Sequence, residues 1–83
     1  MKLSIRRTII EKMVKHRIWG GKHVSVENVS KGFPPHLKRE VLDEIKSLIK
    51  EGIIISKPTS YGLQISLNPR MKATIEEIIR SSL

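Results

Sequence analysis

Residues 33–52 read FPPHLKREVLDEIKSLIKEG, and this stretch decides the fold. Its apolar side chains recur at the spacing of one helix face, at Leu37, Val41, Leu42, Ile45, Leu48 and Ile49. Pro34 and Pro35 suit a first turn, where backbone N–H groups have no intrahelical partner. Gly52 suits a left-handed C-terminal cap. The stretch therefore predicts a helix of roughly four turns over residues 34–51.

The polar face of this predicted helix is unevenly charged. Cationic and imidazole side chains come first, at His36, Lys38 and Arg39, and acids follow at Glu40, Asp43 and Glu44. Cations in a first turn oppose the helix dipole and cost a few tenths of a kcal/mol each. This order is typical of a helix that enters beside phosphates with its N-terminus leading. It is equally compatible with a solvated face that has no partner.

The rest of the chain divides into short periodic segments. Ser4 is the predicted N-cap of a helix over residues 5–17, which Gly20 and Gly21 end. Residues 22–24 leave room for one short strand, and Ser25 caps a helix over 26–31 that ends at Gly32. Two strands, 53–57 and 63–67, flank a turn at 58–62, and a last helix covers 70–82.

Several apolar side chains are expected in the core. They are Val26, Val29, Leu63, Ile65 and Leu67, with Trp19 as a plug rather than a base-stacking platform. The last helix has a longer apolar stripe than one small core needs, formed by Met71, Ile75, Ile78, Ile79 and Leu83. This stripe either docks on the first helix or forms the seam of a homodimer.

Length and composition predict one domain over residues 1–83. The chain has no cysteine, so neither disulfides nor thiolate metal sites can staple the fold. No apolar run reaches the ~18 residues of a membrane span, and the N-terminus lacks the apolar region of a signal peptide. We therefore expect a cytoplasmic protein without a membrane partner.

The positive charge is concentrated in the first half. The formal net charge is +8, and the first 39 residues hold ten Lys/Arg against two acids, whereas the remainder holds six of each. A pI near 10.2 with this asymmetry favours a polyanionic partner, nucleic acid before membrane.

The order of the predicted elements is helix, short strand, helix, turn, helix, hairpin and helix. In this order the chain, from about Ser4 to Ile79, resembles the small archaeal and bacterial winged helix-turn-helix DNA-binding proteins. The resemblance implies an α+β fold with a three-helix core, a two- or three-stranded β-hairpin wing and a C-terminal helix. It also implies that the long helix enters the major groove, led by Pro35, His36, Lys38 and Arg39. The wing tip, which touches the DNA backbone or minor groove in that family, corresponds to Lys57, Thr59, Ser60 and Tyr61.

Further cations are candidate phosphate contacts. Lys22 and His23 precede the short helix and could clamp a phosphate near its N-terminus, and Lys31 lies beside the turn. The first helix carries a broader positive set that serves either as a second phosphate track or for solubility, namely Arg6, Arg7, Lys12, Lys15 and Arg17. Tyr61 could stack on a sugar, but we expect it to pack on the hairpin.

Nothing in the sequence indicates catalysis. There is no nucleophile elbow, no phosphate-cradling glycine loop and no HExxH pattern. His16, His23 and His36 lack the spacing of metal ligands, so neither a metal nor a cofactor is expected.

The leading hypothesis is a non-enzymatic protein that binds double-stranded DNA as a transcriptional or chromosomal regulator. The alternative is a winged-helix adaptor that docks a protein partner in a transcription or replication assembly, because the wing has one cation, Lys57, and the long helix is acidic in its middle. RNA is less favoured because the chain has one Trp, one Tyr and one Phe for base stacking.

Overall fold

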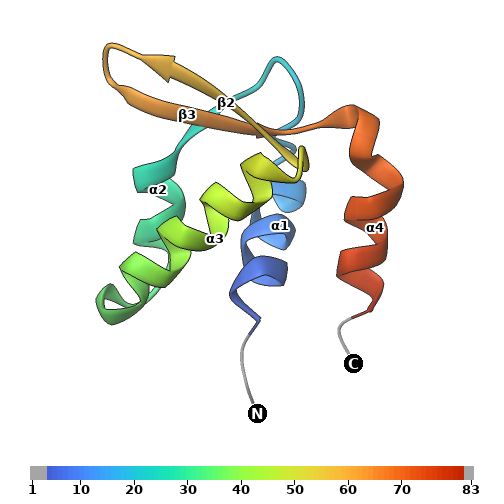
Figure 1. The fold of residues 1–83 in the computed structure, drawn as a ribbon, viewed down its shortest axis with the longest axis horizontal. Coiled ribbons are helices and arrows are strands. Elements are labelled where there is room, and N and C mark those ends of the chain that lie inside the picture. Colours follow the sequence, from blue (N-terminus) through green and yellow to red (C-terminus); the bar gives the residue numbers. More distant parts are fainter. Residues whose placement is uncertain (1–3, 82–83) are drawn as a thin grey trace.

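The computed structural model describes residues 4–81 and has an α+β architecture (Figure 1). The helices are α1 (Ile5–Lys15), α2 (Val26–Lys31), α3 (Lys38–Lys50) and α4 (Lys72–Arg80). The strands are β1 (Val24–Ser25), β2 (Ile54–Thr59) and β3 (Gly62–Leu67), and short 3₁₀ turns at Pro35–Leu37 and Pro69–Met71 precede α3 and α4. The predicted order of three helices, a β-hairpin and a C-terminal helix is confirmed. Leu83 lies outside the described residues.

The sheet is antiparallel, has the order β1-β3-β2 and lies across one end of the helices (Figure 1). β1 pairs with β3 at Val24 and Ile65, so the hairpin gains a third strand. Both hairpin strands are longer than predicted, because Pro58 pairs with Leu63 and Thr59 with Gly62. Pro58 is tolerated there since β2 is an edge strand, where a missing N–H breaks no inner ladder. The turn is thereby reduced to Ser60 and Tyr61.

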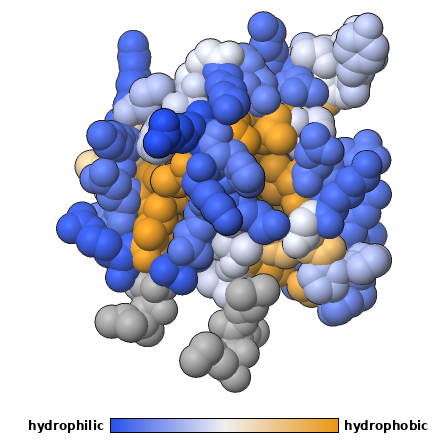
Figure 2. All heavy atoms as spheres, turned by 180° about the vertical axis from the view of Figure 1, so that it is seen from behind, coloured by the Kyte–Doolittle hydropathy of each residue, from blue (hydrophilic) through white to orange (hydrophobic). Residues whose placement is uncertain are grey.

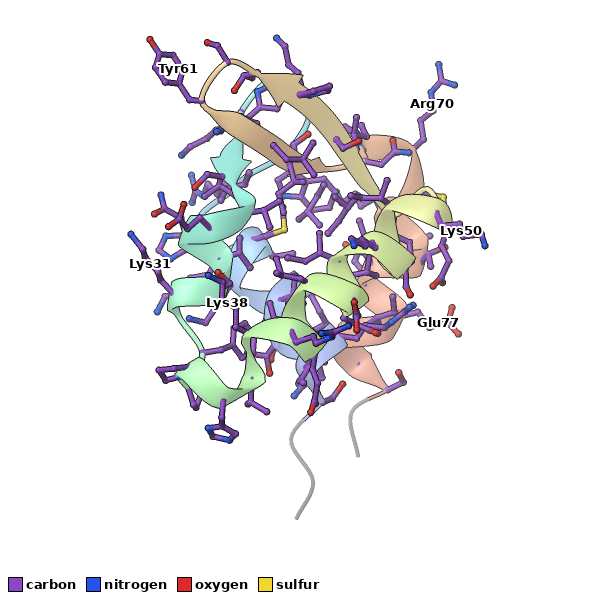
Figure 3. The ribbon with its side chains drawn as sticks, turned by 60° about the vertical axis from the view of Figure 1, so that its left-hand side comes forward. Lys31, Lys38, Lys50, Tyr61, Arg70 and Glu77 are labelled. Atoms are coloured by element: carbon purple, nitrogen blue, oxygen red, sulfur yellow. The ribbon has the colours of Figure 1, made fainter. Side chains whose placement is uncertain are left out.

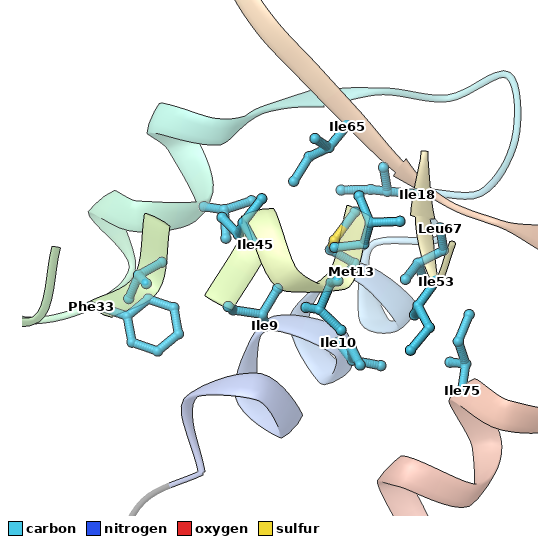
Figure 4. Packing of buried hydrophobic residues seen from close by; sticks show 14 residues of the cluster. Ile9, Ile10, Met13, Ile18, Phe33, Ile45, Ile53, Ile65, Leu67 and Ile75 are labelled. Carbon is cyan, nitrogen blue, oxygen red and sulfur yellow. The ribbon is translucent and has the colours of Figure 1, made fainter. Parts of the chain in front are cut away.

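The core lies between the sheet and the helices (Figure 4). α1 and α3 contribute the largest share, and the strands and α4 close it, with these buried residues: Ile9, Ile10, Met13, Val41, Ile45, Leu48, Ile53, Ile54, Ile65, Leu67 and Ile75. Leu63 was expected here but is 39% exposed, because only the half of β3 nearest its end is covered by helices. Val29 is buried as predicted, whereas Val26 is half-buried.

α1 ends earlier than the glycine pair predicted. Ser4 caps its start as expected, accepting a hydrogen bond from the N–H of Arg7 at 3.2 Å. At the other end, Arg17 adopts a left-handed φ of 55°, and the N–H groups of Arg17 and Ile18 bond to the carbonyls of Val14 and Met13. These two bonds form a Schellman cap, in which the left-handed residue is usually glycine. An arginine occupies that place here.

α3 ends with the same cap built on glycine. Gly52 has a φ of 80°, and the N–H groups of Gly52 and Ile53 bond to the carbonyls of Ile49 and Leu48. This confirms the predicted cap. Gly32 after α2 differs, because its φ is −76°. Its lack of a side chain makes room for the ammonium of Lys12, which would collide with a Cβ at that position.

The two caps predict opposite responses to exchange of glycine. Arg17→Gly is expected to raise the free energy of unfolding by about 0.5–1 kcal/mol, since a left-handed L-residue costs roughly 1–2 kcal/mol and glycine returns part of this as chain entropy. Gly52→Ala is expected to lower it by about 1 kcal/mol from backbone strain alone, because a Cβ there meets no atom within 4 Å. Urea titrations followed by circular dichroism measure both. A loss of stability in Arg17→Gly would contradict the strain at that cap.

The start of α3 is also later than predicted. Pro34 is extended, as expected for a residue that precedes proline, and Pro35–Leu37 forms a 3₁₀ turn before the α-helix begins at Lys38. The apolar pattern of residues 37–49 therefore predicts the helix correctly, while its first turn is tighter than an α-helix.

Among residues 4–81, no helix is long and apolar enough to cross a membrane.

Candidate nucleic-acid interface

The outward face of α3 is basic. Val41, Ile45 and Leu48 are buried, and at 3.6 residues per turn the side chains on the opposite face are Arg39, Asp43, Lys46 and Lys50, which are all exposed. With Lys38, we call these five residues the α3 face. Pro35, His36, Lys38 and Arg39 line one open hollow together with Leu42, Asp43 and Lys46. The structure thus brings the four predicted residues at the helix start together on one surface.

Two acids of α3 and its cap are turned away from this face toward α1. The guanidinium of Arg6 donates from Nε to Glu44 Oε1 at 2.7 Å and from its two terminal nitrogens to Glu51 at 2.9 and 2.5 Å. The hydrogen bonds to Glu51 raise the pKa of Arg6 above its ordinary value, and the same guanidinium lowers the pKa of Glu51. Arg6 therefore neutralises Glu44, one of the three acids on the polar face of the long helix, together with Glu51 at its C-terminal end.

This ion-pair cluster predicts a stability that falls in acid. Because the folded pKa of Glu51 is lowered from its ordinary 4.5, its contribution is present above that pH and is lost as the pH falls through the folded pKa. Glu51→Gln is expected to lower the unfolding free energy slightly near neutrality, where the wild-type ion pair is intact, and therefore to flatten the decline below pH ~4.5, where the two proteins converge. Urea midpoints at several pH values measure this. Parallel pH profiles for wild type and variant would contradict it.

The tip of the hairpin is exposed, and one of its side chains forms hydrogen bonds within the turn. Lys57, Thr59, Ser60 and Tyr61 are all exposed. The hydroxyl of Thr59 donates to the carbonyl of Gly62 at 2.7 Å and accepts from the N–H of Tyr61 at 3.2 Å. Tyr61 was expected to pack on the hairpin, and that prediction is wrong, because its side chain is 94% exposed (Figure 3). A two-residue turn offers it no covered surface, and nearby Leu63 is itself exposed.

The hairpin tip, α2 and the start of α3 meet at a second hollow. Tyr61 and Leu63 come from the hairpin, Val26 and Ser30 from α2, and Lys38 from α3. Lys38 therefore borders both hollows and connects the hairpin tip to the α3 face. Lys31, the last residue of α2, is exposed (Figure 3).

Other predicted contacts lie elsewhere. The ammonium of Lys22 donates to the carbonyl of His16 at 3.2 Å, so it folds back on the end of α1. The N-terminus of α2 is capped by Ser25, whose hydroxyl accepts from the N–H of Asn28 at 3.0 Å. His23 is half-buried beside β1. The structure therefore does not place Lys22 beside the other predicted contacts on α3.

The cations of α1 separate into engaged and free groups. Arg7 pairs with Glu11 at 3.3 Å and donates to the carbonyl of Ile79 at 3.1 Å. Lys12 donates to the carbonyl of Gly32 at 3.4 Å and lies 5.7 Å from the centre of the Phe33 ring. Arg6 is held by the acids beside α3. Two exposed cations, Lys15 and Arg17, lie at the C-terminal end of α1.

Lys46 and Lys50 were missed as candidate contacts by the sequence interpretation. They follow Arg39 by seven and eleven positions, so the helical period that located the core also puts them on the opposite face. The same period that predicts the buried face of this helix therefore also predicts these two cations on its outward face.

α4 packs against α1, which confirms one of the two alternatives for its apolar stripe, while the homodimer seam stays a prediction. An apolar hollow remains between them, lined by Val14, Trp19, Pro69, Ile75 and Ile79, with Lys72 and Glu76 at its polar part. Trp19 is half-buried there and its neighbour Gly20 donates to the carbonyl of Leu67 at 3.1 Å. Figure 2 shows hydrophobic surface exposed in separate areas between hydrophilic side chains.

Within residues 4–81, no three His, Cys, Asp or Glu side chains lie close enough to hold a metal ion. Comparisons of the chain with protein-family models, with curated proteins and with solved structures found no match.

Proposed function

We propose that the chain is a winged helix-turn-helix domain that binds double-stranded DNA without catalysing a reaction, as a transcriptional or chromosomal regulator. α2, the turn at Phe33 and α3 follow the order in which the second helix of a helix-turn-helix unit reads the major groove. The β2-β3 hairpin then serves as the wing. The α3 face enters the groove, and the hairpin tip contacts the flanking backbone.

The observation that carries this proposal is the charge of the α3 face. It holds four cations, Lys38, Arg39, Lys46 and Lys50, against one acid, Asp43. Of the acids that favour an adaptor, Glu44 is neutralised by Arg6 on the side of α1, while Glu40 and Asp43 stay exposed. A helix with this distribution presents a positive surface to phosphates although its sequence contains both acidic and basic residues.

Each side chain has a role that follows from its chemistry. The planar guanidinium of Arg39 can donate two parallel hydrogen bonds to a guanine edge, whereas the ammonium groups of the three lysines act as point charges toward phosphates. Ser60 and Tyr61 stand free at the hairpin tip and can donate hydroxyl hydrogen bonds to the backbone. The major groove, about 12 Å wide, admits one helix such as α3.

The experiment is an anisotropy titration of labelled duplex DNA at about 50 and about 200 mM salt, with a random duplex and a pool of genomic fragments as ligands. If about six phosphates are neutralised, the slope of log affinity against log salt is near −5. Selected fragments that stay bound at the higher salt support a regulator. Loss of all binding there would contradict sequence-specific recognition.

A second candidate function is the protein adaptor. The observation that favours it is the apolar hollow between α1 and α4, where Trp19, Ile75 and Ile79 leave a surface that a partner's apolar side chain could fill. Under this function, DNA affinity is only non-specific and is lost at about 200 mM salt on every duplex. The same titration therefore separates the two functions.

A further inference from the structure

A second group of cations gathers at the C-terminal end of α1. Lys15, Arg17 and Lys22 are exposed, and we call them the α1-end cluster. The loop returns over the helix end, since the ammonium of Lys22 donates to the carbonyl of His16 at 3.2 Å. Among residues 4–81, the ion pairs use only Arg6 and Arg7 as cations, and the acid nearest in sequence, Glu11, is held by Arg7. The α1-end cluster is therefore positive without internal compensation.

This cluster is separate from the α3 face. Arg6 reaches across to Glu44 and Glu51 beside α3, and Lys15 follows Arg6 by nine positions, which is two and a half turns at 3.6 residues per turn. Lys15 therefore leaves α1 on the side opposite α3. The molecule measures 39 × 32 × 22 Å, so even its shortest dimension exceeds the Debye length of about 8 Å at physiological salt. Lys15 and the α3 face therefore lie on different sides of α1.

The backbone supplies an independent observation. Arg17 occupies the left-handed position of the α1 cap, with a φ of 55°, where glycine is the usual residue. A cation therefore occupies a place where it strains the chain, and strained residues concentrate at functional positions. Favourable interaction with the helix dipole does not require Arg17, because Lys12 and Lys15 already lie in the last turn of α1.

We propose that the α1-end cluster binds the backbone phosphates of a second DNA duplex, so that one copy of the chain bridges two duplexes. This inference rests on the proposed function of the α3 face. The cluster lies on a helix end and a loop rather than on a helix face that could enter a groove, and two of its three members are lysines. Contact with the second duplex is therefore sequence-independent and strongly weakened by salt.

The test is a capture assay with full-length protein and two duplexes of unrelated sequence, one immobilised and one labelled. Lys15→Gln/Arg17→Gly is compared with Lys72→Gln/Arg80→Gln, which removes the same two charges from α4. We expect wild type and the α4 variant to capture the labelled duplex at about 50 mM salt, and the α1 variant to capture at least ~10-fold less. One-to-one affinity for a single duplex, measured by anisotropy, should change less than ~3-fold in the α1 variant.

The outcomes separate the inference from the function on which it rests. Tight single-duplex binding without capture, or capture that the α1 variant retains, would overturn the second surface. Retained capture would point instead to a dimer that uses two α3 faces. If wild type binds no duplex at either salt, both proposals fail. A loss of stability does not confuse the comparison, since Arg17→Gly is expected to stabilise the fold.

Discussion

Replacing Ile45 by alanine is expected to lower the free energy of unfolding by about 3 kcal/mol, within the range of roughly 2–5 kcal/mol for such truncations. Ile45 is 1% exposed on the buried side of α3 and belongs to the core cluster with Ile9 and Met13 (Figure 4). The chain has 83 residues, so its total stability is about 4–12 kcal/mol. One truncation at this position therefore removes a large part of the stability.

The matched control is Ile55→Ala, which deletes the same atoms on β2. Ile55 is 41% exposed, so its truncation should cost less than about 1 kcal/mol. Urea titrations of both variants, followed by far-UV circular dichroism, measure the difference. Equal losses in the two variants would mean that the packing around α3 does not dominate the core.

The second large effect is on DNA. Lys38→Gln/Arg39→Gln is expected to weaken duplex binding about 100-fold at low salt, because each lost contact of this kind costs about 1–3 kcal/mol. The salt slope should fall by about 1, because Lys38 is the member of the pair assigned to a phosphate. Both residues stand in the first turn of α3, where cations oppose the dipole, so the variant should unfold at an equal or slightly higher urea concentration.

The control for that variant is Lys72→Gln/Arg80→Gln, which carries the same net charge but leaves the α3 face intact. Anisotropy titrations at two salt concentrations compare the two. If both double variants lose affinity equally, attraction depends on total charge alone, and the assignment of α3 as the reading helix is wrong.

The helices and the hairpin were predictable because their signals are local. The spacing of Val41, Ile45 and Leu48 gives the buried face of α3, and Ser4 and Ser25 cap α1 and α2 through hydroxyls three positions from the N–H groups they satisfy. Gly52 marks the end of α3 because glycine adopts a left-handed conformation at little cost. Such features need only a few neighbouring residues.

The remaining features depend on residues distant in sequence. Arg6 meets Glu44 and Glu51 only once α1 and α3 are packed, across 38 and 45 positions, and β1 pairs with a strand that begins far along the chain. The cap at Arg17 after α1 was not predictable either, because an arginine gives no local sign of a left-handed conformation. Tyr61 shows the same limit, since its exposure follows from the length of strands that continue past Pro58.

Trp19 gives the molecule a built-in optical reporter at one junction. Its side chain is half-buried among Val14, Pro69 and Ile75, so it senses α1, the segment after β3 and α4 at once. It is also the one tryptophan in the sequence, and its emission has a single source. A red shift of that emission while circular dichroism stays constant would mark the detachment of α4 from an otherwise folded molecule. The order in which the parts of this fold separate can thus be followed by light, without adding a label.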